Sequence, residues 1–157
     1  MRCLALLASL LITFSGSVLA QTQITVTHGA VPAPTYIDLG TPGDSVGDQR
    51  IWQFDGQTPD NRTVVMEWIM TTTGRGALVS GMETRVTSAV FSFDGASQDT
   101  ILVQGVGLYP LAGSTLKSSA VLQRAVIGGT GKYTGAMGSV TSTHLANNTW
   151  QHVFNLK

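Results

Sequence analysis

The chain has 157 residues, with nine basic and nine acidic side chains, so its formal net charge at neutral pH is zero. Nucleic-acid binding relies on clustered lysine and arginine, and this balance therefore argues against a nucleic acid as partner. Charged residues make up only 11% of the sequence, which is few for a protein surface.

The first predicted element is a secretory signal peptide over residues 1–20. Arg2 supplies a positive start, residues 3–14 form an apolar run, and Ala20 ends a small-residue pattern typical of a cleavage site. The run is shorter than the about 20 apolar residues of a membrane-spanning helix, so an uncleaved anchor is the weaker alternative and no membrane insertion is expected after cleavage. We therefore expect a secreted or periplasmic protein with one domain over residues 21–157.

The only cysteine of the chain, Cys3, lies within this segment. Its removal would leave no disulfide, no cysteine nucleophile and no thiolate metal ligand in the mature protein. The fold must then be stabilised by a packed core, which a chain of this length can supply as a single domain.

The rest of the sequence alternates polar and apolar residues with a period of two, is rich in β-branched side chains and shows no helical apolar stripe. Turn residues separate the alternating runs, for example at 41–44, 58–61 and Asp94-Gly95. The alternating runs, in chain order, are 23–28, the short run 35–39, 47–54, 63–73, 82–93, 100–105, 119–127, 135–145 and 149–156, and they give about eight strands.

These strands and short turns predict an all-β fold, an eight-stranded antiparallel up-and-down β-barrel of the calycin-like type. Closure removes the free sheet edges and leaves an interior that can hold one small ligand. A Greek-key sandwich is the alternative for a soluble domain. A membrane barrel fits less well, because the sequence shows no aromatic girdle and no consistently apolar outer face.

A glycine-rich segment, Ala125 to Val140 (AVIGGTGKYTGAMGSV), contains a Gly-Lys pair like that of a phosphate-binding loop. A phosphate-binding loop needs Ser or Thr after the lysine, and a helix after that. Here Tyr133 follows Lys132, and the next predicted element is a strand. We therefore interpret the glycines as a backbone corner between two strands.

The same segment resembles the C-terminal signature of the allene oxide cyclase barrels and the VVGGTG segment of plant dirigent proteins, which share that fold. Further segments resemble the cyclases in the same order along the chain: PTYIDL (34–39), VGD (46–48), ILVQG (101–105) and WQHVFNLK (150–157). Together they cover most of residues 24–157. The resemblance implies a barrel with a ligand cavity that opens at one end.

The resemblance also implies a function. The cyclases isomerise an unsaturated fatty-acid epoxide without metal or cofactor, and dirigent proteins steer the coupling or cyclisation of phenolic intermediates. By resemblance, this protein would bind a small apolar or phenolic molecule and guide its cyclisation or coupling with no cofactor. A non-catalytic carrier and a structural barrel with a filled interior are the alternatives. The related plant proteins form trimers, so a homo-oligomer, dimer or trimer, stays open.

The sequence departs from the cyclases at several site positions. Their first-strand glutamate falls on Thr25, their asparagine falls on Thr27, and their cavity cysteine has no counterpart in the mature chain. Their tyrosine falls near Gly107, with Tyr109 two residues further on. We therefore expect a conserved type of barrel with a changed site.

Three residues are candidates for a catalytic role: Asp48, Glu67 and Tyr109. Asp48 lies near a strand start where both families carry an acid, although a turn-capping aspartate would fit this position equally well. Glu67 interrupts the apolar row of Val65 and Ile69 and must face either the lumen or solvent. A carboxylate in the lumen would stabilise positive charge on a bound substrate.

Five residues are candidates for ligand binding: Pro34, Met66, Trp68, Arg85 and Arg124. Pro34 matches a proline of the cyclases, and Met66 and Trp68 share a strand face suited to an adaptable pocket or to an ordinary core. If the two arginines point inward, they would form a polar cavity floor with a glutamate. On a solvated face they would form surface ion pairs that contribute little to stability.

The three tryptophans of the chain would line an aromatic cavity or form a structural core. The three histidines, His28, His144 and His152, fall on different predicted strands, and no carboxylate lies at a metal-ligand spacing from any of them. No metal site is therefore predicted.

Overall fold

The computed structural model describes residues 22–76, 78–95, 98–111, 113 and 115–157. The predicted signal peptide, residues 1–20, lies outside the described residues. Within the described ranges, no helix is long and apolar enough to cross a membrane.

The described residues form β-strands and one short 3₁₀ helix, η1 (Gly131–Tyr133). The strands are β1 (Thr22–His28), β2 (Thr35–Ile37), β3 (Gln49–Gln57), β4 (Thr63–Arg75), β5 (Met82–Phe93), β6 (Thr100–Pro110), β7 (Val121–Gly129), β8 (Gly138–His144) and β9 (Trp150–Leu156).

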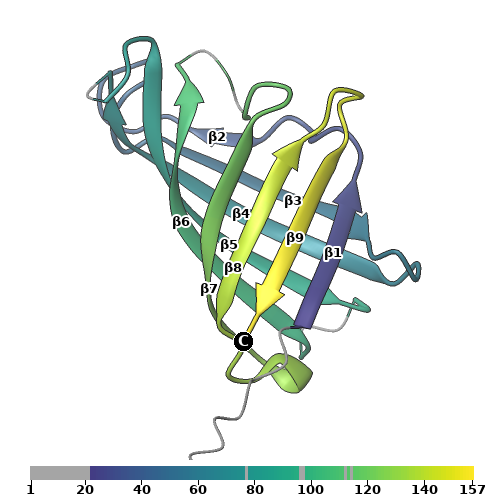
Figure 1. Ribbon diagram of the computed structural model, residues 1–157. Coiled ribbons are helices and arrows are strands. Elements are labelled where there is room, and N and C mark those ends of the chain that lie inside the picture. Colours follow the sequence, from purple (N-terminus) through teal and green to yellow (C-terminus); the bar gives the residue numbers. More distant parts are fainter. Residues whose placement is uncertain (1–21, 77, 96–97, 112, 114) are drawn as a thin grey trace, which may run out of the picture.

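All strand pairs are antiparallel, and the strands follow the order β1-β9-β8-β7-β6-β5-β4-β3-β2. The barrel closes where β1 pairs with β3 through Thr27 and Gln57. The short strand β2 pairs with the other end of β3, from Thr35 opposite Ile51 to Ile37 opposite Gln49. Figure 1 shows the resulting barrel, with the first and last strands side by side. The predicted eight-stranded up-and-down barrel is confirmed, with β2 as an added edge strand.

The strand that differs most from prediction is β6, which continues to Pro110 instead of ending at Gly105. Glycines usually mark turns, but here Gly105 and Gly107 stay within the strand and make room for interior side chains. A Cβ on Gly105 would lie 2.9 Å from Cγ of Arg124, and a Cβ on Gly107 would lie 2.9 Å from Cε2 of Tyr109. The two glycines thus allow two large polar side chains to lie against the backbone of β6.

The glycine-rich segment forms the predicted corner. It leaves β7 at Gly129, makes the single turn η1 and enters β8 at Gly138, with no α-helix. Gly131 has a φ of 57°, a left-handed conformation that favours glycine. Lys132 is exposed and pairs with Asp99 at 2.9 Å and with Asp94 at 3.4 Å.

One half of the barrel interior is filled with apolar side chains. Phe91, Phe93 and Phe154 are fully buried, and the rings of Phe91 and Phe154 meet edge to face with centroids 4.9 Å apart. Burying each such side chain contributes about 1.5–3 kcal/mol to folding. Polar and aromatic side chains line the other half, and they form the site described next.

Candidate functional site

A pocket lies in the half of the lumen that Thr115, Leu116 and Trp150 line, beside the connection from β6 to β7 and the start of β9. Figure 1 shows that this end of β9 lies away from the C-terminus. It has about 380 Å³ of space not filled by protein atoms, part of it open to solvent. The centre of a water molecule reaches only about 30 Å³ of that space, so most of the lumen is filled by side chains. Its lining is His28, Val31, Trp52, Phe54, Trp68, Met70, Tyr109, Thr115, Leu116, Arg124, Ser142, Trp150 and His152.

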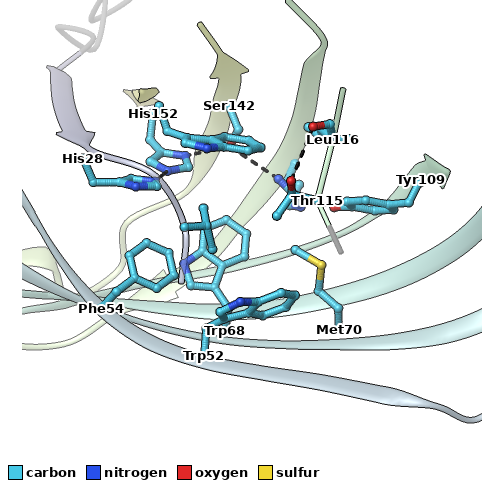
Figure 2. A pocket seen from close by; sticks show the side chains of 13 residues that line it. His28, Trp52, Phe54, Trp68, Met70, Tyr109, Thr115, Leu116, Ser142 and His152 are labelled. Atoms are coloured by element: carbon cyan, nitrogen blue, oxygen red, sulfur yellow. Dashed lines mark hydrogen bonds between the residues drawn. The ribbon is translucent and has the colours of Figure 1, made fainter. Parts of the chain in front are cut away.

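All three tryptophans of the chain line this pocket. Trp52 and Trp68 are directly opposite each other on β3 and β4, and Figure 2 shows them across the pocket from His28 and His152. Trp52 Nε1 donates a hydrogen bond to the Pro32 carbonyl at 2.9 Å. Three large aromatic side chains make these walls suited to a flat, apolar molecule.

Strand register brings the three histidines together around Trp150. His28 and His144 are the direct partners of Trp150 on the two strands beside β9. The His144 and Trp150 rings are stacked with centroids 4.4 Å apart, and the His28 and Trp150 rings with centroids 6.0 Å apart. The described residues contain no group of three or more histidine, cysteine or acidic side chains that could hold a metal ion.

Hydrogen-bond geometry assigns the protons on two of these imidazoles. The Gly29 carbonyl can only accept, so His28 Nδ1, 2.7 Å away, carries a proton and donates. In a neutral ring His28 Nε2 then accepts from His152 Nε2, 3.1 Å away. His152 Nδ1 is left to accept from the Ser142 hydroxyl at 2.8 Å. A directed chain of hydrogen bonds thus runs from Ser142 through both imidazoles to Gly29. Figure 2 shows the part of it that joins Ser142, His152 and His28.

Both imidazoles of this chain are held neutral. Burial lowers the pKa of His28 to about 4, with the bond to Gly29 opposing the shift. Burial lowers the pKa of His152 well below its ordinary value, and the charges of His28 and Arg124 act in the same direction. At neutral pH both rings are therefore neutral groups that accept on one nitrogen and donate from the other.

Arg124 extends from β7 into the same pocket and is 3% exposed. Its Nη2 donates to the Tyr109 hydroxyl at 2.6 Å, and its Nη1 lies 3.4 Å from Ser142 Oγ. The guanidinium carbon also lies over the Trp68 ring, 5.1 Å from its centroid. Two of the predicted ligand-binding residues, Trp68 and Arg124, and the predicted catalytic Tyr109 therefore meet at one place.

A second arginine, Arg85, lies beside this group. It is fully buried, its guanidinium lies 4.5 Å from the centroid of the Tyr109 ring, and its Nε donates to Glu83 Oε1 at 2.5 Å. The same Glu83 oxygen lies 3.4 Å from Arg50 Nη2. The interior Glu–Arg pair expected from the sequence exists, but Glu83 and not Glu67 provides its carboxylate.

Glu67 is on the outer face of β4 and is exposed, with Oε1 accepting a hydrogen bond from Gln53 Nε2 at 3.1 Å. The prediction that it acts inside the lumen is therefore wrong. The physical reason is that the row Val65, Glu67 and Ile69 faces outward, although two of its three members are apolar, and Ile69 is 47% exposed. The opposite row of the strand, with Met66, Trp68 and Met70, faces the interior.

Asp48 is fully buried but lies outside the pocket lining. Its carboxylate accepts hydrogen bonds from the Tyr36 hydroxyl at 2.5 Å and from the backbone N–H groups of Ser45 and Leu39 at 2.6 and 2.9 Å. The Tyr36 bond, with these N–H groups, holds the pKa of Asp48 well below its usual range. Asp48 thus fixes the loop before β3, as the turn-capping alternative expected.

Three of the predicted ligand-binding residues do not line the pocket: Pro34, Met66 and Arg85, which was described above. Met66 is fully buried in the apolar half of the lumen, where its Cε lies close to Gly56. Pro34 is half-buried in the segment before β2.

His28, Ser142 and His152 line the pocket but were not predicted as site residues. A signal for two of them was present in the sequence. Ser142 is two residues from Val140, and His152 is two residues from Phe154, so each shares a strand face with a fully buried apolar residue. Such a residue marks the inward face of a strand.

No protein-family model matches the sequence, and no curated protein matches it either. Two solved structures have similar folds. One is a pyocyanin demethylase, with a TM-score of 0.62 and 16% identity over 88% of this chain and 100% of the other. The second is a pterocarpan synthase dirigent protein, with a TM-score of 0.55 and 14% identity over 95% of this chain and 96% of the other. At such identities the likeness shows the fold alone, a closed antiparallel β-barrel like that of the dirigent protein.

Proposed function

We propose that this chain is a secreted barrel, exported by the predicted signal peptide, that binds a small apolar molecule in its lumen and guides its cyclisation or stereoselective coupling without a cofactor. The observation that carries the proposal is the pocket itself, where three tryptophans surround the polar group of Arg124, Tyr109 and Ser142. Both structural neighbours are named for reactions of small molecules, which supports a chemical role for a barrel of this kind.

The pocket offers the two things that such a reaction needs from a protein. Its aromatic walls would hold a flexible or reactive substrate in one conformation and exclude water. Its polar group would stabilise negative charge that develops on an oxygen, through the guanidinium of Arg124 and the hydroxyl of Tyr109. The neutral imidazole of His152, hydrogen-bonded to Ser142, lies in place to exchange a proton through that hydroxyl.

The space in the pocket is small, so a ligand has to displace side chains as it enters. Leu116 is the side chain best placed to move, because it lies between β6 and β7, outside any strand, and also lines the pocket. Loops move more readily than the strands they connect. Entry by way of this loop would leave the strands of the barrel unchanged.

A non-catalytic carrier is the second candidate, and one observation favours it. None of the described residues that line the pocket is a carboxylate, because Asp48 and Glu67 both lie elsewhere. A catalytic role therefore depends on Tyr109 and the neutral histidines, whereas a carrier needs only the aromatic walls.

Native mass spectrometry of the protein purified from its own host tests the proposal, and a bound small molecule is the expected result. That molecule or its precursor is then incubated with the protein. A cyclase yields an isomer of the same mass or a coupled product, whereas a carrier returns the molecule unchanged. We expect Tyr109→Phe to slow product formation by about 100-fold or more with little effect on binding. Equal rates with Tyr109→Phe and the natural protein would contradict the role of this hydroxyl.

A further inference from the structure

The buried charges of the barrel are not balanced around Arg124. Among the described residues, the buried ionic side chains are three arginines (Arg50, Arg85 and Arg124) and two carboxylates (Asp48 and Glu83). Glu83 lies within ion-pair distance of both Arg85 and Arg50. The Asp48 carboxylate is hydrogen-bonded to Tyr36, Leu39 and Ser45 near the start of β3. Neither buried carboxylate therefore forms an ion pair with Arg124.

The contacts of Arg124 are neutral throughout. Its hydrogen-bond partners are the hydroxyls of Tyr109 and Ser142, and its Nε has no partner among the described residues. Burial lowers the pKa of its guanidinium, and the interaction with the Tyr109 hydroxyl opposes this shift. A guanidinium nevertheless remains charged, so a full positive charge lies in the pocket wall with no counter-ion among the residues that the structure describes.

Such an arrangement is unfavourable unless something neutralises it. A buried charge without an ionic partner destabilises a protein, and apolar residues of similar volume would usually be more stable there. The surrounding residues nevertheless accommodate this side chain, because Gly105 leaves space for its aliphatic part and the Trp68 ring lies under its guanidinium. A charge that is accommodated in this way, beside an apolar pocket, fits a ligand that brings the missing negative charge.

We propose that Arg124 binds the carboxylate of the ligand, and that the body of the ligand is aromatic or otherwise flat and apolar and lies among Trp52, Trp68 and Trp150. The guanidinium fork matches a carboxylate, and the Tyr109 hydroxyl, which accepts from Nη2, has its own proton as a further donor. This inference rests on the proposed function, since it requires that the pocket takes a small molecule. It narrows the substrate class from apolar molecules in general to hydrophobic carboxylic acids.

Matched pairs of acids and amides test the inference on the natural protein. Suitable pairs are 3-phenylpropionate with 3-phenylpropanamide and 1-naphthylacetate with 1-naphthylacetamide, which share a skeleton and differ in charge. Because all three tryptophans line the pocket, quenching of their fluorescence reports entry, and isothermal titration calorimetry gives the affinity. We expect each acid to bind at least about tenfold more tightly than its amide, as a charged hydrogen bond requires.

Variants then assign the preference to Arg124. Arg124→Met, which keeps the length of the side chain and removes its charge, should bind the acid and the amide equally. Arg124→Lys should keep part of the preference for the acid. Arg62→Met, at a partly exposed arginine outside the pocket, is the matched control and should behave as the natural protein.

The outcomes separate this inference from the proposed function. If acid and amide bind the natural protein with equal affinity, the pocket takes small apolar molecules but the inference is overturned. If the preference for the acid persists in Arg124→Met with a folded barrel, Arg124 is not the group responsible and the inference is again overturned. If no acid and no amide binds at all, the inference and the proposed function both fail for ligands of this class.

Discussion

At the scale of single residues, the direction of a side chain decides what its charge can do. Glu67 and Arg124 both interrupt apolar stretches in the middle of strands, yet the first is exposed and the second is 3% exposed. The exposed carboxylate accepts a hydrogen bond from Gln53 across the strand pair. The buried guanidinium instead determines the electrostatics of the pocket.

We predict that Glu67→Gln leaves the protein essentially unchanged. The side chain is solvated on the outer face, where substitutions usually alter stability by no more than about 0.5 kcal/mol. Ligand affinity measured by tryptophan quenching and stability in urea should both match the natural protein. A tenfold loss of affinity in this variant would mean that the outer face of β4 takes part in binding.

The buried histidines make a specific prediction for the pH dependence of stability. Histidines of the unfolded chain take up protons as the pH falls through about 6.5, whereas His28 in the folded protein does so only near pH 4. Between these values the unfolded state binds more protons, so stability must fall as the pH falls, by up to about 1.4 kcal/mol per pH unit for each such histidine. His152, with its pKa lowered further, acts in the same direction.

Urea unfolding between pH 7 and pH 4.5 measures this effect. We expect His28→Gln, which keeps an acceptor for His152, to reduce the slope by about half, because one of two such histidines remains. Ser142→Ala is the control, since it removes a hydrogen bond but no imidazole, and it should keep the slope. The pKa values of Asp48, Asp60 and Asp99 are lowered, so these carboxylates weaken the fold only at more acidic pH. An unchanged slope in His28→Gln would show that this ring is not held neutral.

At the scale of elements, β6 positions the Arg124 side chain because Gly105 has no Cβ at the point where the two meet. A Cβ on Gly105 would lie 2.9 to 3.3 Å from Cγ, Cβ and Cα of Arg124, which includes backbone that cannot move aside easily. We predict that Gly105→Ala displaces Arg124, lowers stability by about 1–3 kcal/mol and weakens binding of hydrophobic acids more than binding of their amides. Calorimetry with the matched acid and amide measures this difference.

Gly128 on the neighbouring strand provides a matched control. A Cβ there would meet nothing within 4 Å, so Gly128→Ala should leave the affinities and the stability close to those of the natural protein. If both alanine variants behave alike, the close approach between β6 and Arg124 does not position the guanidinium.

At the scale of the whole molecule, the barrel was predictable because its signals are local. Alternation over single strands and turn residues between them identify the elements, and antiparallel neighbours with short connections follow the chain order. The site was only partly predictable. Both rows of β4 are largely apolar, so the sequence alone does not show that Trp68 faces inward and Glu67 outward.

The contact between Tyr109 and Arg124 could not be predicted from the sequence of either strand alone. It depends on the pairing of β6 with β7, where the register shifts between Leu102 and Val103. A shift of one residue exchanges the inner and outer faces of a strand, and no pattern within either strand reveals it. The contact of His28 with His152 likewise joins the first and last strands, 124 residues apart.

In the filled half of the lumen, Phe91, Phe93 and Phe154 are fully buried and close one end of the barrel interior. As far as the described residues show, a ligand that enters beside Leu116 must leave by the same opening. If the protein is an enzyme, product and substrate exclude each other from that single entrance, and inhibition by added product is competitive. The turnover rate of such an enzyme cannot exceed the rate of product release through this opening.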